Sequence, residues 1–140
     1  MGDAARRAAA PDPRWRLVIA DDDAAMRGLV RFAVGAWFDE VVEVGDGRAL
    51  LWDLMASWFA STPGHAPHAL IVTDLHMPLY SGLDVVDAWR EVQPEVPVLL
   101  ITAFPSAEQD RRAREVGAAM LAKPFSLAEL RGAVKALHAA

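Results

Sequence analysis

The sequence predicts an α/β fold: an open, doubly wound sheet of five parallel strands with helices on both faces. Short apolar segments alternate five times with amphipathic segments along the 140 residues. The apolar segments do not alternate with polar residues, which is typical of strands buried on both faces of a parallel sheet. Five such units are too few to close a barrel of eight, so we expect the sheet to stay open.

The composition is that of one globular domain. Hydrophobic residues make up 54% of the sequence and charged residues 24%, which supplies enough apolar surface for a core. The 19 acidic and 14 basic residues give a net charge of −5, whereas nucleic-acid binders carry a basic surface. No cysteine is present, which excludes disulfides, thiol nucleophiles and zinc–thiolate sites. We therefore expect no direct binding of nucleic acid.

The N-terminal residues differ from the rest of the chain. Residues 1–14 are rich in Ala, Arg, Pro and Asp without periodicity, which predicts a disordered leader before a domain over residues 15–140. No segment approaches the roughly 18 apolar residues needed to cross a bilayer, and no secretory signal is recognisable. We expect a cytoplasmic protein without a membrane partner. The length leaves no room for a separate output domain of usual size.

The first two strand–helix units are predicted before residue 60. Residues 16–20 (RLVIA) form an apolar run that ends at three aspartates, as expected of a buried strand, and a second strand is predicted at 41–44. Apolar residues three and four positions apart predict the two helices. These stripes are Met26, Leu29, Val30, Ala33, Val34 and Trp37, and then Leu50, Leu51, Leu54, Met55, Trp58 and Phe59. Residues 61–68 (STPGHAPH) show neither the helical nor the strand spacing of apolar residues and are rich in Pro and Gly, so a loop is predicted there.

The third and fourth units follow the same order. Residues 69–73 (ALIVT) and 97–101 (PVLLI) are the predicted strands, each followed by a polar residue. A helix is predicted over residues 82–93. The next helix is expected to begin at Ser106, where Gln109 three residues later suggests a capping box, and to end near Gly117.

The fifth unit completes the chain. Residues 119–122 form a short strand before Lys123 and Pro124. The last helix opens with the capping-box pattern of Ser126 and Glu129. Its apolar stripe consists of Leu127, Leu130, Val134 and Leu137.

Polar side chains collect where four of the predicted strands end. Asp21 and Asp22 follow the first strand, Asp74 the third, Thr102 the fourth and Lys123 the fifth. In an open α/β sheet the ligand site lies beyond the carboxyl ends of the strands. We therefore expect these side chains to converge on one crevice, although any single strand-end aspartate is more commonly an ordinary loop residue.

The charge of this cluster predicts a metal ion. Two carboxylates about 4 Å apart repel by roughly 4 kcal/mol at an effective dielectric constant near 20. Asp21, Asp22 and Asp74 carry three negative charges and Lys123 one positive charge, so one divalent cation would neutralise the set. Oxygen ligands with room for water suit Mg2+.

A carboxylate, a hydroxyl group, a lysine and a metal ion together suit phosphoryl transfer. The carboxylate attacks phosphorus, and the cations and the hydroxyl group hold the equatorial oxygens. Asp74 is the predicted nucleophile because it stands alone after a central strand, whereas the adjacent Asp21 and Asp22 are better placed to share the metal ion. Thr102 and Lys123 are the predicted partners of the phosphoryl oxygens.

The sequence resembles the receiver domains of response regulators over about residues 16–137. The matching segments are LVIADDDAAMR (17–27), IVTDLHMPLYSGLD (71–84), VLLITAF (98–104) and VGAAMLAKPFSLAEL (116–130). The resemblance implies a flavodoxin-like fold with strand order 2-1-3-4-5. It also implies a signalling protein of a two-component system, with self-phosphorylation chemistry of its own, and not a classical enzyme.

The resemblance assigns a role to each polar residue. It implies that Asp74 accepts a phosphoryl group from a phosphohistidine of a sensor histidine kinase or histidine phosphotransfer protein. Asp22 and Asp74 would bind Mg2+ directly, the backbone carbonyl of His76 would add a third protein ligand, and Asp21 would act through water. A cis peptide bond between Lys123 and Pro124 is expected.

Two further positions bear on how such a switch works. Met120 stands on the fifth strand where the family usually has Tyr or Phe as a rotating switch residue, so the coupling to Thr102 is expected to be looser. Gly82 resembles the family's turn glycine, for which we expect a positive φ. Output would use the face of the fourth helix, fifth strand and fifth helix, toward a downstream protein or in a homodimer.

Two other functions were weighed against this one. An aspartate-nucleophile phosphatase of the haloacid-dehalogenase type needs a second acid two residues after the nucleophile, and that position holds His76. A degenerate receiver that only binds proteins, independently of phosphorylation, is the remaining alternative. The intact set of Asp22, Asp74, Thr102 and Lys123 argues against it.

Overall fold

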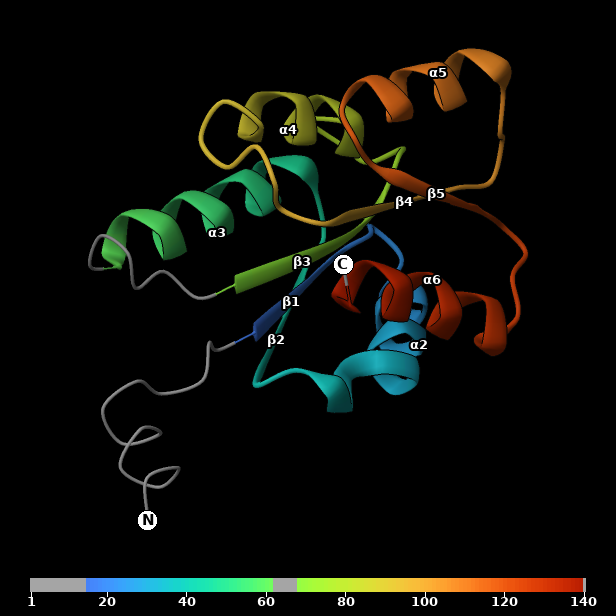
Figure 1. The fold of residues 1–140 in the computed structure, drawn as a ribbon, viewed down its shortest axis with the longest axis horizontal. Coiled ribbons are helices and arrows are strands. Elements are labelled where there is room, and N and C mark those ends of the chain that lie inside the picture. Colours follow the sequence, from blue (N-terminus) through green and yellow to red (C-terminus); the bar gives the residue numbers. More distant parts are fainter. Residues whose placement is uncertain (1–14, 62–67, 140) are drawn as a thin grey trace.

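The sheet confirms the predicted fold class. The computed structural model describes residues 15–61 and 68–139, so the predicted leader and most of the predicted loop lie outside the described residues. Five parallel strands are arranged in the order β2-β1-β3-β4-β5 (Figure 1). The neighbours of β1 are β2 and β3, so the strand order reverses beside it.

The strands lie within about one residue of their predicted bounds. They are β1 (Trp15–Ala20), β2 (Glu40–Val44), β3 (His68–Asp74), β4 (Val98–Thr102) and β5 (Ala119–Ala122). The largest difference is in β3, which extends by one residue at each end. Asp74 therefore pairs with Ile101 of β4 and belongs to the sheet, and is not part of the loop that follows.

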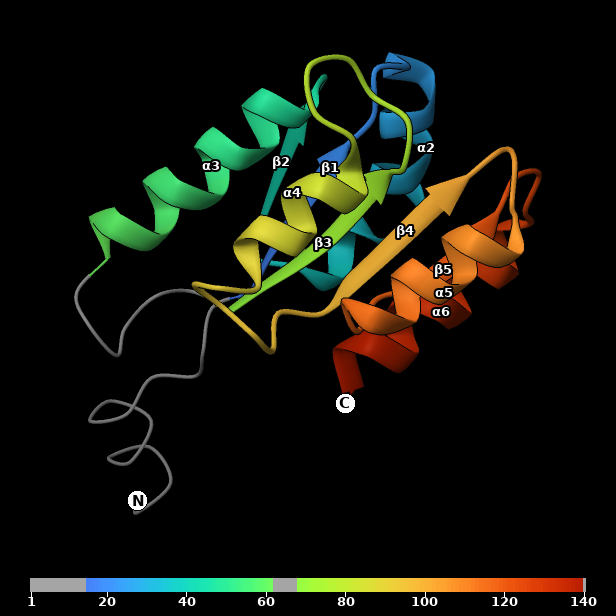
Figure 2. The ribbon, with the colours of Figure 1, turned by 90° about the horizontal axis from the view of Figure 1, so that it is seen from above.

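Helices cover both faces of the sheet. On one face lie α2 (Ala24–Val34) and α6 (Leu127–Ala139), and on the other lie α3 (Gly47–Ala60), α4 (Gly82–Trp89) and α5 (Ala107–Glu115) (Figures 1 and 2). A short 3-10 helix, η1 (Gly35–Trp37), extends α2. In the described part of the chain, no helix combines the length and the apolar character that crossing a membrane requires.

The core consists of two layers separated by the sheet. Successive residues of β3 point to opposite faces, so Leu70 and Val72 pack toward α2 and α6, while Ile71 packs toward α3 and α4. All three side chains are almost completely inaccessible to solvent. This rigid sheet fixes the positions of the residues at the ends of its strands.

Parts of the predicted helical stripes are wrong. Leu29, Trp37 and Phe59 were expected on buried faces, but 36%, 38% and 70% of their surfaces are exposed. The α-helix ends at Val34, and the tighter 3-10 winding of η1 turns Trp37 away from the stripe. The helix expected over residues 82–93 also ends earlier, at Trp89.

Candidate functional site

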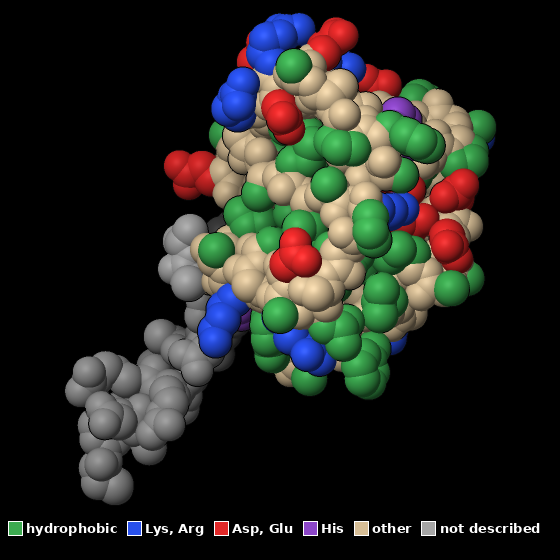
Figure 3. All heavy atoms as spheres, turned by 90° about the vertical axis from the view of Figure 1, so that its right-hand side faces the viewer, with side chains coloured by type: hydrophobic (Ala, Val, Ile, Leu, Met, Phe, Trp, Pro, Cys, Tyr) green, Lys and Arg blue, Asp and Glu red, His purple; other side chains and the backbone are tan. Residues whose placement is uncertain are grey.

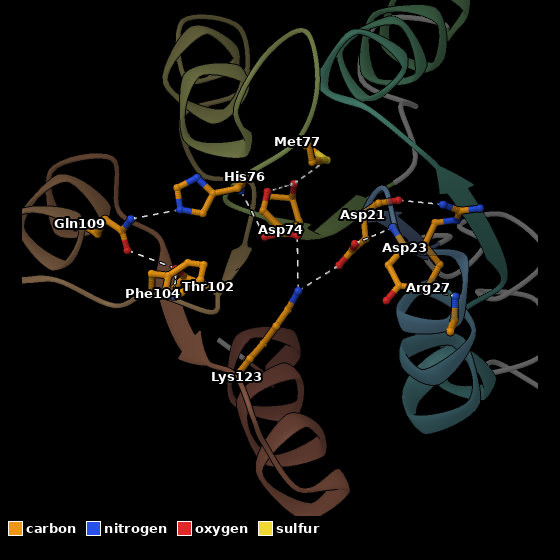
Figure 4. Close-up of polar contacts among 12 residues, drawn as sticks. Asp21, Asp23, Arg27, Asp74, His76, Met77, Thr102, Phe104, Gln109 and Lys123 are labelled. Atoms are coloured by element: carbon orange, nitrogen blue, oxygen red, sulfur yellow. Dashed lines mark hydrogen bonds and ion pairs between the residues drawn. The ribbon is translucent and has the colours of Figure 1, made fainter.

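The polar residues at the strand ends converge as the sequence predicts. Asp21 follows β1, Asp74 ends β3, Thr102 ends β4 and Lys123 follows β5. Figure 4 shows the side chains of Asp21, Asp74 and Lys123 pointing toward one another, with Thr102 beside them. The parallel sheet causes this convergence because the carboxyl ends of all its strands lie at the same edge.

Three carboxylates form the acidic part of the site. One oxygen each of Asp21, Asp22 and Asp74 lies within 4.8 Å of the other two. Asp21 and Asp74 are buried, whereas Asp22 is exposed. The cluster therefore has two fixed carboxylates and one at the solvent boundary.

Lys123 bridges the two buried carboxylates. Its Nζ atom lies 3.4 Å from Oδ2 of Asp74 and 3.6 Å from Oδ2 of Asp21. The backbone N–H of Lys123 donates to the carbonyl oxygen of Thr102 at 2.8 Å, which fixes the start of the lysine side chain against β4. The peptide bond between Lys123 and Pro124 is cis, as the resemblance implied.

Asp21 shows the electrostatic cost of this arrangement. Burial raises the pKa of its carboxyl group above the ordinary value, and the charges of Asp74 and Asp22 raise it further. A hydrogen bond from the backbone N–H of Asp23 at 2.9 Å and the ammonium group of Lys123 act in the opposite direction. Arg27 donates to the backbone carbonyl of Asp21 at 2.7 Å and so holds the loop rather than the carboxylate.

The backbone holds Asp74 in place. Its Oδ1 atom accepts a hydrogen bond from the N–H of His76 at 3.2 Å, and Leu75 donates to the carbonyl of Ile101 at 2.8 Å. Gly82 packs against this segment. A Cβ atom at Gly82 would lie 2.3 Å from the carbonyl oxygen of Asp74 and 2.7 Å from Oγ1 of Thr73.

The conformation expected for Gly82 is wrong. Among the described residues of the loop between β3 and α4, the positive φ belongs to Leu79, at 74°, and Gly82 is the first residue of α4. Glycine is required at position 82 because any side chain would collide with the backbone of Asp74. The sequence pattern identified the right residue for the wrong physical reason.

Thr102 is completely buried, and its hydroxyl group has two partners. Oγ1 accepts a hydrogen bond from the N–H of Phe104 at 3.1 Å and donates to Oε1 of Gln109 at 3.2 Å. Gln109 also brings its Nε2 atom to 3.4 Å from Nε2 of His76. The sequence analysis assigned Gln109 to a helix cap and missed this contact, because a local pattern does not reveal which side chain lies across the site.

His76 lies at the rim of the site. Its side chain is exposed, and its ring centroid is 6.5 Å from that of Phe104. In the part of the chain that the structure describes, the acidic group suited to a metal ion comprises only Asp21, Asp22 and Asp74. The expected role of the His76 backbone carbonyl as a metal ligand stays a prediction.

The donor set fits Mg2+. Hard carboxylate oxygens within 4.8 Å of one another match the preference of this ion for oxygen ligands. The exposed position of Asp22 leaves a side open to solvent, as an ion that retains several water molecules requires. Burial, together with the charges of Asp74 and Asp22, raises the pKa of the Asp21 carboxyl group, and a bound cation would act in the opposite direction.

A family model described as the response regulator receiver domain matches residues 17–135. The chain belongs to this family. Its five-stranded sheet and strand order are those expected of such a receiver domain. The functional class that the resemblance implied, a module of two-component signalling, is therefore confirmed.

Known relatives of this receiver domain are regulators of transcription. The chain is 34% identical to the DNA-binding transcriptional regulator NtrC of Rhizobium meliloti (strain 1021) over 120 residues, or 84% of this chain and 23% of that protein. It is 34% identical to the transcriptional regulatory protein PrrA of Mycobacterium tuberculosis over 123 residues, or 87% and 49% of the two chains. The chain thus spans 23% of the length of the first relative and 49% of the length of the second.

Solved structures that resemble this chain also belong to response regulators. The chain is similar to a BeF3-activated DrrB receiver domain, with 26% identity and a TM-score of 0.74, covering 91% of this chain and 99% of that one. DrrB is a Thermotoga maritima response regulator described as a homologue of OmpR and PhoB. The predicted fold of this receiver domain thus agrees with an experimentally determined one.

Proposed function

We propose that this receiver domain is a phosphorylation switch in which Asp74 accepts a phosphoryl group. The observation that carries the proposal is the position of Asp74, buried at the end of a central strand between an ammonium group and two other carboxylates. The donor is a phosphohistidine of a sensor histidine kinase or a histidine phosphotransfer protein. The signalling system is cytoplasmic, and this domain makes no direct contact with nucleic acid.

The transfer exchanges one bond to phosphorus for another. A carboxylate oxygen of Asp74 forms a bond to phosphorus while the bond between phosphorus and the donor's histidine nitrogen breaks. The departing imidazole keeps the electron pair of that bond and takes a proton from solvent. Lys123 and the hydroxyl group of Thr102 stabilise the oxygens of the transferred group.

The acidic cluster holds the ion that this reaction needs. Asp22 and Asp74 are direct ligands of Mg2+ in our proposal, the backbone carbonyl of His76 is a third, and Asp21 acts through water. Bound Mg2+ supplies positive charge that offsets repulsion between the carboxylates and the approaching phosphoryl oxygens. Asp21 and Lys123 set the charge of the pocket, and the burial of Asp74 keeps bulk water away from its carboxylate.

The output surface is the face formed by α5, β5 and α6. Figure 3 views the molecule from the side on which these helices lie in Figure 1, and hydrophobic side chains gather between its charged groups. Thr102 joins this face to the site because Lys123, at the end of β5, bonds to its backbone. A downstream protein or a second copy of the chain binds this face after phosphorylation.

The proposal is tested by incubating the protein with acetyl phosphate and Mg2+ and measuring its intact mass. We expect a gain of one phosphoryl group that disappears when Mg2+ is chelated and in Asp74→Asn. Asp84→Asn is the matched control, because Asp84 is an exposed carboxylate near the start of α4. No gain in the wild-type protein would contradict the proposal and favour a degenerate receiver that only binds proteins.

A further inference from the structure

The side chain of Gln109 connects the site to the start of α5. Its carbonyl oxygen accepts the hydroxyl hydrogen bond of Thr102 at 3.2 Å, and its amide nitrogen lies 3.4 Å from Nε2 of His76 (Figure 4). Gln109 thus spans the end of β4 and the loop after β3. The amide nitrogen is a donor, so the imidazole nitrogen facing it is the acceptor.

Two helices of this chain carry the same capping pattern with different outcomes. At α6 the box is closed, since Glu129 donates its N–H to Oγ of Ser126 at 3.0 Å and its carboxylate accepts from the N–H of Ser126 at 3.1 Å. At α5 only the first bond forms, from the N–H of Gln109 to Oγ of Ser106 at 3.1 Å. The side chain that would close the second box is turned into the site.

Thr102 cannot serve Gln109 and a phosphoryl group at once. A hydroxyl group donates one proton, and in the structure that proton points to Gln109. The hydroxyl oxygen also accepts a hydrogen bond from the N–H of Phe104, but a phosphoryl oxygen is itself an acceptor and needs the proton of Thr102. A phosphoryl oxygen on Asp74 therefore competes with Gln109 for the same hydrogen bond.

We propose that Gln109 is a positioning residue that holds the Thr102 hydroxyl group in the resting state and closes the cap of α5 once a phosphoryl group displaces it. The released carbonyl oxygen has a partner three residues earlier, in the backbone N–H of Ser106, as in the closed box of α6. Phosphorylation is thereby converted into a more stable first turn of α5. This inference rests on the proposed function, and it identifies Gln109 as the residue that couples phosphorylation to the structure of α5.

The test uses beryllofluoride with Mg2+ as the phosphoryl mimic and two readouts by NMR. Affinity is read from the shift of the His76 backbone amide, and capping from the hydrogen-exchange rate of the Ser106 N–H. We expect Gln109→Leu to bind the mimic about three- to tenfold more tightly, since one competing hydrogen bond is gone. In the wild type the mimic should slow exchange at Ser106 several-fold, whereas in Gln109→Leu it should not.

Glu129→Leu is the matched control, because it opens the equivalent cap of α6 and leaves Thr102 untouched. Its affinity for the mimic should equal that of the wild type. An unchanged affinity in Gln109→Leu, or an unchanged exchange rate at Ser106 in the wild type, would overturn the inference. Failure of the wild type to bind the mimic at all would instead overturn the proposed function.

Discussion

The Nζ atom of Lys123 lies 3.4 Å from Oδ2 of Asp74, and these two residues are 49 positions apart in the chain. The contact joins the ends of β3 and β5, which are separated in the sheet by β4. The lysine partly neutralises Asp74, and in the proposed function its ammonium group also stabilises a phosphoryl oxygen. Replacing it should therefore affect metal binding and phosphorylation in opposite directions.

Lys123→Ala should bind Mg2+ more tightly and accept a phosphoryl group more slowly. Removal of one positive charge a few ångströms from the carboxylates is expected to raise the Mg2+ affinity by about three- to tenfold. Loss of the same charge from the phosphoryl oxygens should slow phosphorylation by at least about tenfold. Titration calorimetry measures the first effect and the time course of intact mass the second.

Lys135→Ala is the control for this substitution, because Lys135 is the other lysine of the chain and is exposed on α6. It should leave both quantities near the wild-type values. If Lys123→Ala weakened Mg2+ binding, the assignment of its charge to the metal pocket would be wrong.

Asp21 should make the stability of the Mg2+-free protein depend on pH. Burial raises the pKa of its carboxyl group above 3.8, so the folded state binds this proton more tightly than the unfolded state. The contribution of this group to the free energy of unfolding is then greatest below pH 3.8 and is lost as the pH rises through the raised pKa. In Asp21→Asn that loss should vanish, and at pH 7 the melting temperature should rise by a few degrees.

Added Mg2+ should reduce the advantage of Asp21→Asn, because the wild type binds the ion more tightly and gains more stability from it. Asp87→Asn, at an exposed position of α4, serves as the control and should keep the wild-type pH dependence. Melting curves between pH 3 and pH 8, with chelator or with Mg2+, measure these effects. A lower melting temperature for Asp21→Asn in chelator would argue against the repulsion described here.

Gly82→Ala should destabilise the fold. The added Cβ would lie 2.3 Å from the carbonyl oxygen of Asp74, which forces the backbone of the site to move at an expected cost of about 2–3 kcal/mol. Gly132→Ala is the matched control, because Gly132 lies within α6 with nothing within 4 Å of the new atom. That variant should gain about 0.5–1 kcal/mol. Urea unfolding of both proteins checks the difference in sign.

The strand-end residues could be predicted from the sequence because their position depends on topology alone. An apolar run followed by Asp74 or Thr102 places that residue at one edge of a parallel sheet, whatever the details of packing. The apolar stripe of a helix predicts buried residues less reliably near the end of the helix. Trp37 follows the helical spacing in the sequence, but the change to 3-10 winding after Val34 removes it from the buried face.

Contacts across the site could not be predicted. The pattern of Ser106 and Gln109 is identical in kind to that of Ser126 and Glu129, and only the three-dimensional structure shows that Gln109 reaches Thr102 instead. The positive φ of Leu79 is equally hidden, since leucine rarely adopts that conformation. Both features depend on tertiary neighbours rather than on local preference.

Arg90 should matter for stability and leave the chemistry of the site unchanged. Its guanidinium group donates to the carbonyl oxygens of Val116 at 2.7 Å, Val96 at 2.5 Å and Gly117 at 3.2 Å, which ties the end of α4 to the segments before β4 and β5. Arg90→Met leaves these carbonyls without that donor and should cost about 2 kcal/mol in the free energy of unfolding. Phosphorylation of the folded variant should proceed at the wild-type rate.

Arg111→Met is the control for Arg90, because its ion pair with Glu115 on α5 is exposed to solvent. Such a pair contributes little, so the change should stay within about 0.5 kcal/mol. Chemical unfolding measures both variants. A loss for Arg111→Met equal to that for Arg90→Met would show that these arginines act through general charge and not through the carbonyl contacts.

The most direct measurement identifies the phosphorylated side chain. The protein is incubated with acetyl phosphate and Mg2+ and reduced with borohydride, which converts an aspartyl phosphate to homoserine, and its peptides are sequenced by mass spectrometry. We expect homoserine at position 74 alone, and none when Mg2+ is chelated. Homoserine at position 21 or 22, or none at any position, would contradict the assignment of Asp74 as the acceptor.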